Sequence, residues 1–473
     1  MNANKDRQRR FSVWRSALGF TAKEVLTMSS FKKTMYAAFR ENNTISPAYF
    51  DKYSVKRGLR NPDGTGVMAG VTNICNVHGY VVDDGEKKPA EGKLIFRGYS
   101  IRDLIGKAEA EDRFGFEEIV YLLLTGKRPT MDELAEFTAL LSDNRALPEN
   151  FFEDMILKAP SRDIMNKMAR STLALYSYDS DPESLSPEHE IDTAVSLIAK
   201  MPVIMICAYE TKMRYFSENS MIMHPLIKGQ TTAENILSTL RPDRKFTRDE
   251  AKLLDLMLML HAEHGGGNNS TFSCRVLTSS GTDPYSTYAA AIGSLKGARH
   301  GGANRKVTEM HEYIKANVSD WENEDELSEY LRRILKKEAG DGSGLIYGMG
   351  HAVYTLSDPR AVILKEYAGK MAEGTEFEKE YHLLEAIERL TPLVFEEVKH
   401  SGKVICANID MYSGFVYRML GIPEELFTPL FAVSRMAGWC AHRFEEINSG
   451  KRIIRPAYKS VSHEKKYIDI KDR

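Results

Sequence analysis

The chain has 473 residues and a mass of 53.5 kDa, of which 42% are hydrophobic and 27% are charged. This balance is typical of a soluble globular protein and excludes wholesale disorder, and the length allows two or three domains. With 64 Lys and Arg against 66 Asp and Glu, the net charge is −2, so we expect no nucleic acid partner.

The N-terminus and the cysteines bear on the cellular compartment. The first 24 residues carry two acids and a surplus of basic side chains, which are Lys5, Arg7, Arg9, Arg10, Arg15 and Lys23. We interpret them as a solvated basic helix, and a mitochondrial targeting segment is the alternative. Five cysteines without a CxxC pair fit a reducing compartment better than a disulfide framework or a zinc ribbon. We therefore expect a cytoplasmic protein.

Only the region between Gly64 and Ser100 has a β pattern. Glycines there separate short apolar runs, such as residues 79–82 and 94–96. These runs predict short antiparallel strands or hairpins.

The rest of the chain has the helical period. Residues 116–124, 251–260, 327–337 and 381–400 place apolar side chains on helical faces, and we expect the last of these helices to end at Gly402. The apolar run 197–209 contains Lys200 and Pro202, which makes it too short and too interrupted to cross a membrane. The sequence predicts a mostly α-helical protein with a small antiparallel β element near the N-terminus.

Three segments concentrate histidine and glycine between helical runs. They are His261-Ala-Glu-His264-Gly-Gly-Gly-Asn-Asn-Ser270, Gly297-Ala-Arg-His300-Gly-Gly-Ala-Asn304 and Gly348-Met-Gly-His351-Ala-Val-Tyr-Thr-Leu-Ser-Asp358-Pro-Arg360. Glycine lets a ligand or backbone approach the neighbouring imidazole closely. One such histidine could simply end a helix, but three in one chain favour a shared site.

Other chemistries find little support in these motifs. His261 and His264 lack a recognisable third metal ligand, so we expect no metal. No GxSxG sequence indicates a serine hydrolase. The glycines at 340–350 lack the GxGxxG spacing of a dinucleotide loop.

Three arginines in the C-terminal half of the chain suggest an anionic substrate. Arg360 follows His351 in an Asp-Pro-Arg sequence, and Arg435 and Arg455 lie further on. Each alone could be a surface charge, but guanidinium groups bind carboxylates bidentately. A fourth segment, Ala407-Asn-Ile-Asp410-Met-Tyr-Ser-Gly414, adds a carboxylate. Together these groups fit a small polyanionic substrate.

These segments, in this order and at these separations, resemble the citrate synthase family over residues 57–456. The resemblance implies a two-domain helical fold with the active site in the cleft between the domains. It also implies condensation of acetyl-CoA with oxaloacetate and hydrolysis of citryl-CoA, with coenzyme A as part of a substrate and no permanently bound cofactor. Two positions depart from the family: Met349, and Thr355, where some members carry a basic residue near the coenzyme.

The resemblance implies a role for each motif residue. Asp410 matches the base that removes a methyl proton from acetyl-CoA, His300 the donor to the thioester oxygen, and His351 the group that polarises the ketone of oxaloacetate. The remaining matches bind oxaloacetate and are His264, Arg360, Arg435 and Arg455.

The resemblance also implies an assembly. It maps a small domain to 301–418 and a large domain to 1–300 with 419–473. It further implies a homodimer in which Arg455 is contributed across the interface, and domain closure after oxaloacetate binds.

Two alternatives remain open. The first is 2-methylcitrate synthase, which uses propionyl-CoA, because one methylene is worth only about 1–3 kcal/mol of discrimination. The second is a non-catalytic, regulatory relative, which predicts the loss of one imidazole or charged group, whereas all are present.

Overall fold

The computed structural model describes residues 34–473 except 36, 40, 62, 63, 84 and 85. The basic N-terminal segment lies outside the described residues. The chain forms two compact units, of which the larger is Ala69–Arg455. The other unit consists of Met1–Met68 and Pro456–Arg473, and its described part contains the short helices α3 (Ala48–Lys52), η1 (Arg57–Leu59) and η5 (Ile470–Asp472). Everything discussed below lies in the larger unit.

The predicted β element is confirmed as a three-stranded antiparallel sheet in the order β1-β2-β3. Its strands are β1 (Cys75–Asp83), β2 (Glu86–Phe96) and β3 (Tyr99–Ser100). The β1–β2 register breaks at Gly79, because His78 pairs with Lys93 whereas Tyr80 pairs with Pro89. This is a β-bulge, which interrupts the ladder and bends the hairpin.

The four predicted helices are confirmed. They are α5 (Phe116–Thr125), α10 (Arg248–His261), α14 (Glu324–Leu335) and α16 (Glu378–Lys399). Gly126 ends α5 in the left-handed conformation, with φ of 78°. The expected end of α16 at Gly402 was wrong by two residues, because His400 already adopts the left-handed conformation and donates its N–H to Glu396 O.

The other helices complete the larger unit. They are α4 (Ile101–Ala110), α6 (Met131–Asp143), α7 (Ile164–Ala174), α8 (Pro187–Phe216), α9 (Thr232–Leu240), α11 (Asn269–Thr278), α12 (Pro284–Leu295), α13 (Ala303–Asn317), α15 (Pro359–Ala372), α17 (Asp410–Met419) and α18 (Phe427–Ser449). Single turns occur at η2 (Phe152–Leu157), η3 (Leu175–Tyr178) and η4 (Glu424–Leu426).

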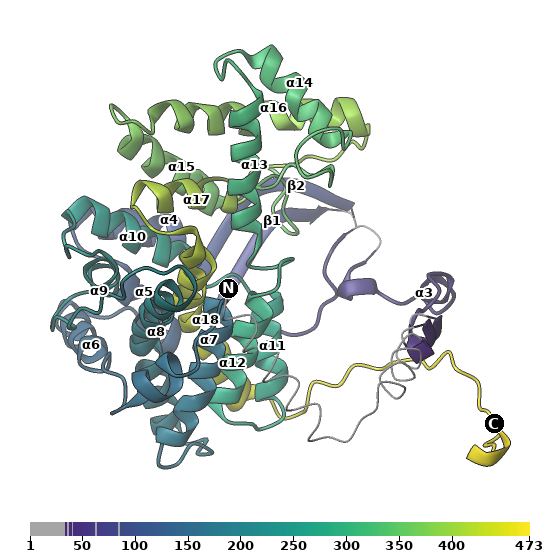
Figure 1. Cartoon of the computed structure of the whole chain (residues 1–473), viewed down its shortest axis with the longest axis horizontal. Helices are drawn as coiled ribbons and strands as arrows, with labels where there is room; N and C mark the ends of the chain where they lie inside the picture. Colours follow the sequence, from purple (N-terminus) through teal and green to yellow (C-terminus); the bar gives the residue numbers. More distant parts are fainter. Residues whose placement is uncertain (1–33, 36, 40, 62–63, 84–85) are drawn as a thin grey trace, which may run out of the picture. The chain divides into compact units, whose positions relative to one another are not determined.

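Helix α18 is the centre of the core. It packs against α5, α8, α10, α11 and α12 (Figure 1). Of its 23 residues 16 are buried, so it is enclosed on nearly all sides. A polar side chain on this helix is therefore held by the surrounding protein rather than by water.

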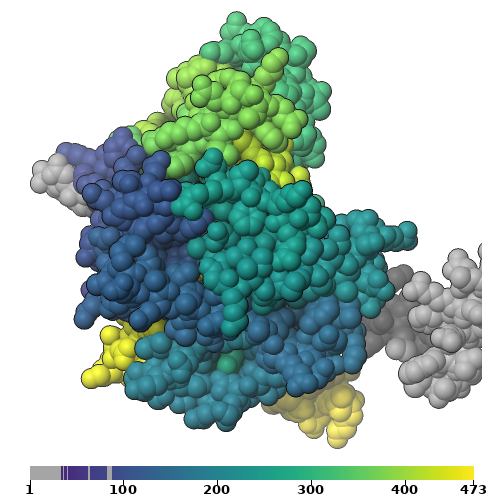
Figure 2. All heavy atoms as spheres, turned by 90° about the vertical axis from the view of Figure 1, so that its left-hand side faces the viewer, coloured from purple at the N-terminus to yellow at the C-terminus, as the bar shows by residue number. Residues whose placement is uncertain are grey.

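Helices α13 to α17 pack mainly on one another and gather at one end of the unit, in green in Figures 1 and 2. The His300 segment leads into this group, and the His351 segment lies within it, between α14 and α15. The division into a small domain of 301–418 and a large domain remains a prediction.

Helix α8 contains the apolar run that we judged too short to cross a membrane. That reason was wrong, because the helix is 30 residues long and is not interrupted at Pro202. In the described part of the chain, it is the one helix with the length and hydropathy of a membrane span. However, 72% of its most apolar window is buried inside the protein. This burial is typical of a core helix.

A buried ion pair joins α8 to α18. Arg443 donates from Nε and Nη2 to the carboxylate of Glu190 at 2.8 and 2.6 Å, and from Nη1 to Thr282 O and Thr287 Oγ1. Both charged side chains are inaccessible to solvent. Neither charge can therefore be lost without leaving the other uncompensated.

Glu190→Gln is expected to lower the free energy of unfolding by about 3–5 kcal/mol, because it leaves the Arg443 charge buried without a counter-charge. Denaturant unfolding of the variant measures this loss. Glu188→Gln, on the exposed face of the same helix, is the matched control. Equal stability of the two variants would contradict the prediction.

Candidate active site

His264 and His351 come from distant segments and meet side by side. His264 follows α10, whereas His351 lies in the loop before α15, and their ring centroids are 5.2 Å apart. Tyr354 lies against both: its ring stacks on His351 at 4.6 Å, and its hydroxyl is 3.3 Å from His264 Nε2. The predicted shared histidine site is thus present for these two residues.

The backbone fixes the tautomer of His351. Its Nδ1 accepts hydrogen bonds from the N–H groups of Val353 and Tyr354, both at 3.0 Å. An acceptor nitrogen carries no proton, so the ring proton of neutral His351 is on Nε2. The imidazole can therefore donate from Nε2.

His300 lies in the tight turn between α12 and α13. A Cβ atom at Gly301 would come within 2.4 Å of Leu295 O, so this turn requires glycine. His300 Nε2 is 3.1 Å from Ser270 Oγ, which also accepts the indole N–H of Trp439 at 3.2 Å. Burial, assisted by the charge of Arg435, lowers the pKa of His300 to about 4, so the ring is neutral at pH 7.

Asp410 is in the first turn of α17 and is tied to the His351 loop through Asn408. The Asn408 side chain accepts the N–H of Asp410 at 3.0 Å and donates to Gly350 O at 2.9 Å. Its backbone N–H donates to Gly348 O at 2.8 Å. Burial raises the pKa of Asp410 to about 6, although the charge of Arg360 opposes this effect. A carboxylate of this pKa is a competent general base near neutral pH.

The site contains two buried arginines, Arg360 and Arg435, which differ in their partners. Arg360 is held by Asp358, to which Nε and Nη2 donate at 3.0 and 2.7 Å. Arg435 donates only from Nε, to His261 O at 2.7 Å. Both Nη atoms of Arg435 are buried and have no partner among the described residues. Its guanidinium lies 4.6 Å from the Phe431 ring, which also flanks His300.

Burial, assisted by nearby positive charge, keeps His264 and His300 neutral. Burial and the charges of Arg360 and Arg435 lower the pKa of His264 well below its usual range. Burial also lowers the pKa of Arg435 to about 10, which leaves the guanidinium charged at pH 7. The site therefore combines neutral imidazole donors with fixed cations, an arrangement suited to a dicarboxylate that carries a ketone.

Arg455 is not brought to this site. It is exposed at the last position of the larger unit, and it forms no hydrogen bond or ion pair with the site histidines, Asp410 or either buried arginine. The assignment of Arg455 as a substrate ligand therefore stays a prediction.

Four further residues organise the site without having been assigned a role from sequence: Ser270, Tyr354, Asp358 and Asn408. Each lies inside a motif that the sequence analysis singled out. For Asp358 a local signal existed, because Asp before Pro is typical of a helix start, and its side chain does cap α15. The other three also contact residues distant in sequence, which spacing alone does not reveal: Ser270 contacts His300, Tyr354 contacts His264 and Asn408 contacts Gly350.

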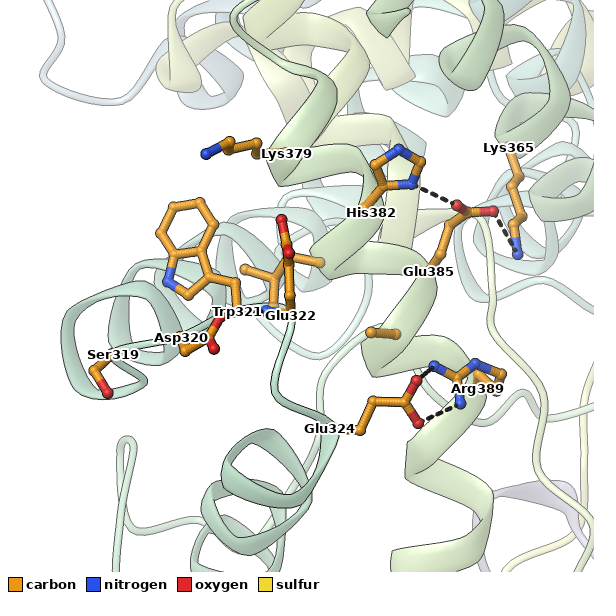
Figure 3. A pocket seen from close by; sticks show the side chains of 12 residues that line it. Ser319, Asp320, Trp321, Glu322, Glu324, Lys365, Lys379, His382, Glu385 and Arg389 are labelled. Atoms are coloured by element: carbon orange, nitrogen blue, oxygen red, sulfur yellow. Dashed lines mark hydrogen bonds and ion pairs between the residues drawn. The ribbon is translucent and has the colours of Figure 1, made fainter.

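A surface pocket of about 790 Å³ lies away from this site, over α14 to α16 (Figure 3). Its charged side chains pair with one another: Arg389 with Glu324, and His382 and Lys365 with Glu385. Its lining includes none of the site histidines, Asp410, Arg360 or Arg435.

Comparisons with known proteins give consistent matches over most of the chain. The family model described as "Citrate synthase, C-terminal domain" matches residues 61–457. The citrate synthase of Deinococcus radiodurans is 34% identical over 387 residues, which cover 81% of this chain and 94% of that protein. Citrate synthase 2 of Bacillus subtilis is 33% identical over 414 residues, covering 86% and 98%.

Solved structures give the same result. The citrate synthase of Thermoplasma acidophilum, solved in a ternary complex with carboxymethyl coenzyme A and oxaloacetate, aligns with a TM-score of 0.70 and 26% identity. The alignment covers 89% of this chain and 99% of that one. The enzyme of Thermotoga maritima aligns with a TM-score of 0.68 and 28% identity over the same shares.

Proposed function

The chain belongs to the citrate synthase family, whose members condense acetyl-CoA with oxaloacetate, and we propose that His300, His351 and Asp410 perform that reaction here. The observation that carries this assignment is the pair of buried Nη atoms of Arg435, which lack a partner among the described residues and lie beside neutral imidazoles. Buried N–H groups without hydrogen bonds are costly, and a substrate carboxylate would complete the hydrogen bonds of this guanidinium.

Oxaloacetate binding follows from the charges. Arg435 offers both Nη atoms to one carboxylate, and Arg360 adds charge that Asp358 orients. His351 donates from Nε2 to the ketone oxygen, and His264 lies beside it. The ketone carbon is thereby made more electrophilic before acetyl-CoA reacts.

Carbon–carbon bond formation begins with proton removal. Asp410 takes a proton from the acetyl methyl group, and His300 donates to the thioester oxygen as the enolate forms. The enolate carbon attacks the ketone carbon, whose oxygen takes a proton from His351. Water then hydrolyses the thioester of citryl-CoA to give citrate and free coenzyme A.

We propose that the site closes between two domains, 301–418 and the remainder, once oxaloacetate is bound. The packing of α13 to α17 on one another supports a separate small domain. Closure excludes water from the enolate. The five cysteines are all free and buried, which supports the proposed cytoplasmic localisation. The proposed reaction, which forms citrate from acetyl-CoA and oxaloacetate, would place the protein in the tricarboxylic acid cycle.

Release of free coenzyme A, followed with acetyl-CoA and with propionyl-CoA in the presence of oxaloacetate, tests the function. We expect acetyl-CoA to have the higher kcat/KM. The 2-methylcitrate synthase alternative predicts the opposite order. No release with either acyl-CoA would favour the regulatory alternative.

We further propose a homodimer whose active site receives Arg455 from the partner chain. Two observations support the shared site. Arg455 is exposed and lies apart from the site of its own chain, and oxaloacetate carries two carboxylates that arginines can bind. Asp410→Asn and Arg455→Ala, each nearly inactive, are expected to regain activity when dissociated and reassociated together, because each hybrid has one intact site. Hybrids that form but stay inactive would show that Arg455 acts within its own chain.

A further inference from the structure

The bulge in the β1–β2 hairpin leaves backbone groups without ladder partners. The residues opposite Gly79, which are 90–92, fall between the two stretches of regular pairing. Gly79 is buried and Ala90 and Gly92 are half-buried, and backbone N–H and C=O groups that are removed from water require hydrogen bonds. Partners for these groups come from another part of the chain.

Two hydroxyl groups from the His351 loop supply these partners. Thr355 Oγ1 donates to Gly79 O and accepts the N–H of Ala90 at 3.2 Å. Ser357 Oγ accepts the N–H of Gly92 at 3.1 Å and donates to the carboxylate of Glu91. Thr355 is the position where some relatives carry a basic residue, and here its side chain is directed to the hairpin.

The hairpin glycines allow this close approach. A Cβ atom at Gly79 would lie 2.6 Å from Tyr354 Cα, and one at Gly92 would lie 2.2 Å from Ser357 O. Both contacts are with backbone, so a side chain at either position would displace the loop. The loop is thus held against the bulge on its hydroxyls and on its main chain.

Displacement of this loop would reach the imidazole directly. The N–H groups of Val353 and Tyr354, which hold His351 Nδ1, immediately precede Thr355. Strand β1 also lies against the segment that carries His264. A Cβ atom added at Gly265, next to His264, would be 3.1 Å from Val77 Cγ2. Strand β1 therefore lies against two of the three histidine-bearing segments, those of His264 and His351.

We propose that the bulged hairpin positions His351 for oxaloacetate, and that Thr355 and Ser357 are the positioning residues that fix the loop to it. The proposal rests on the role of His351 given above. It predicts that the two hydroxyls matter for the ketone substrate and not for acetyl-CoA. It also accounts for the threonine at a position where some relatives carry a basic residue near the coenzyme.

Thr355→Val tests the proposal, since it removes the hydroxyl and retains the shape. We expect the Kd of oxaloacetate, measured by calorimetry without acetyl-CoA, to rise about tenfold or more, with a matching rise in its KM. The KM of acetyl-CoA should change little. Thr355→Ser, which keeps the hydroxyl, should restore binding, and Thr138→Val, which removes a half-buried hydroxyl bonded to backbone on α6, should leave it unchanged.

The other outcomes are distinct. Unchanged oxaloacetate binding in folded Thr355→Val would overturn the proposal, as would equal losses for both substrates. If Thr355→Val does not fold, Ser357→Ala serves, and its unchanged binding would be equally decisive. His351→Ala separates the premise from the inference: normal oxaloacetate binding in that variant would refute the role of His351 itself, whereas impaired binding there with normal Thr355→Val would refute only the positioning.

Discussion

Asp410→Asn is expected to reduce kcat by about 10²- to 10⁴-fold and to leave the Kd of oxaloacetate nearly unchanged. The asparagine retains the size of the side chain but cannot accept the methyl proton. Steady-state kinetics and calorimetry of the same preparation measure both quantities. Asp325→Asn, in the exposed first turn of α14, removes a carboxylate from an equivalent helix position and should retain full activity. Near-normal turnover of Asp410→Asn would refute the assignment of the base.

The pH dependence gives a second signature of Asp410. The base must be ionised, and burial raises its pKa to about 6 from the usual 3.8. Activity of the wild-type enzyme should therefore fall about tenfold per pH unit below pH 6 rather than below pH 4. The residual activity of Asp410→Asn should not show this limb. The same limb in the variant would mean that another group titrates.

His351→Ala and His300→Ala are expected to separate substrate binding from enolisation. Each should lower kcat by about 10²- to 10³-fold, the usual effect of removing one donor to a developing negative charge. His351→Ala should also weaken oxaloacetate binding, because Nε2 donates to that substrate. His300→Ala should chiefly slow deuterium exchange from the acetyl methyl group, measured with a non-reacting oxaloacetate analogue bound.

His382→Ala provides the control for both variants, since His382 is exposed on α16 and pairs only with Glu385 among the described residues. Its kinetics should match those of the wild type. If His300→Ala exchanged deuterium normally while His351→Ala did not, the two roles would be reversed.

The histidine motifs were recognisable in the sequence because their chemistry is local. Glycine beside His300 and His351, and Asp-Pro before Arg360, mark turns and a helix start in any context. The helices were predictable for the same reason, since Gly126 ends α5 through its own conformation. Such features depend on neighbouring residues and not on the fold.

The partners of these motifs could not be predicted in the same way. Ser270 meets His300 across 30 residues, and Thr355 meets Gly79 across 276. Neither contact follows from helical or strand periodicity, because each depends on how distant elements pack. The end of α16 was also misplaced, since a non-glycine residue, His400, adopted the left-handed conformation.

The central position of α18 has a consequence for biosynthesis. Of the helices that surround it, α8 leaves the ribosome about 200 residues earlier and α5 about 300 residues earlier. At roughly 5–20 residues per second, the interval before α18 emerges lasts about 10–60 seconds. During it, the apolar faces that later enclose α18 have no permanent partner. The nascent chain must therefore remain soluble with an unfilled core, and the last helix to emerge completes it.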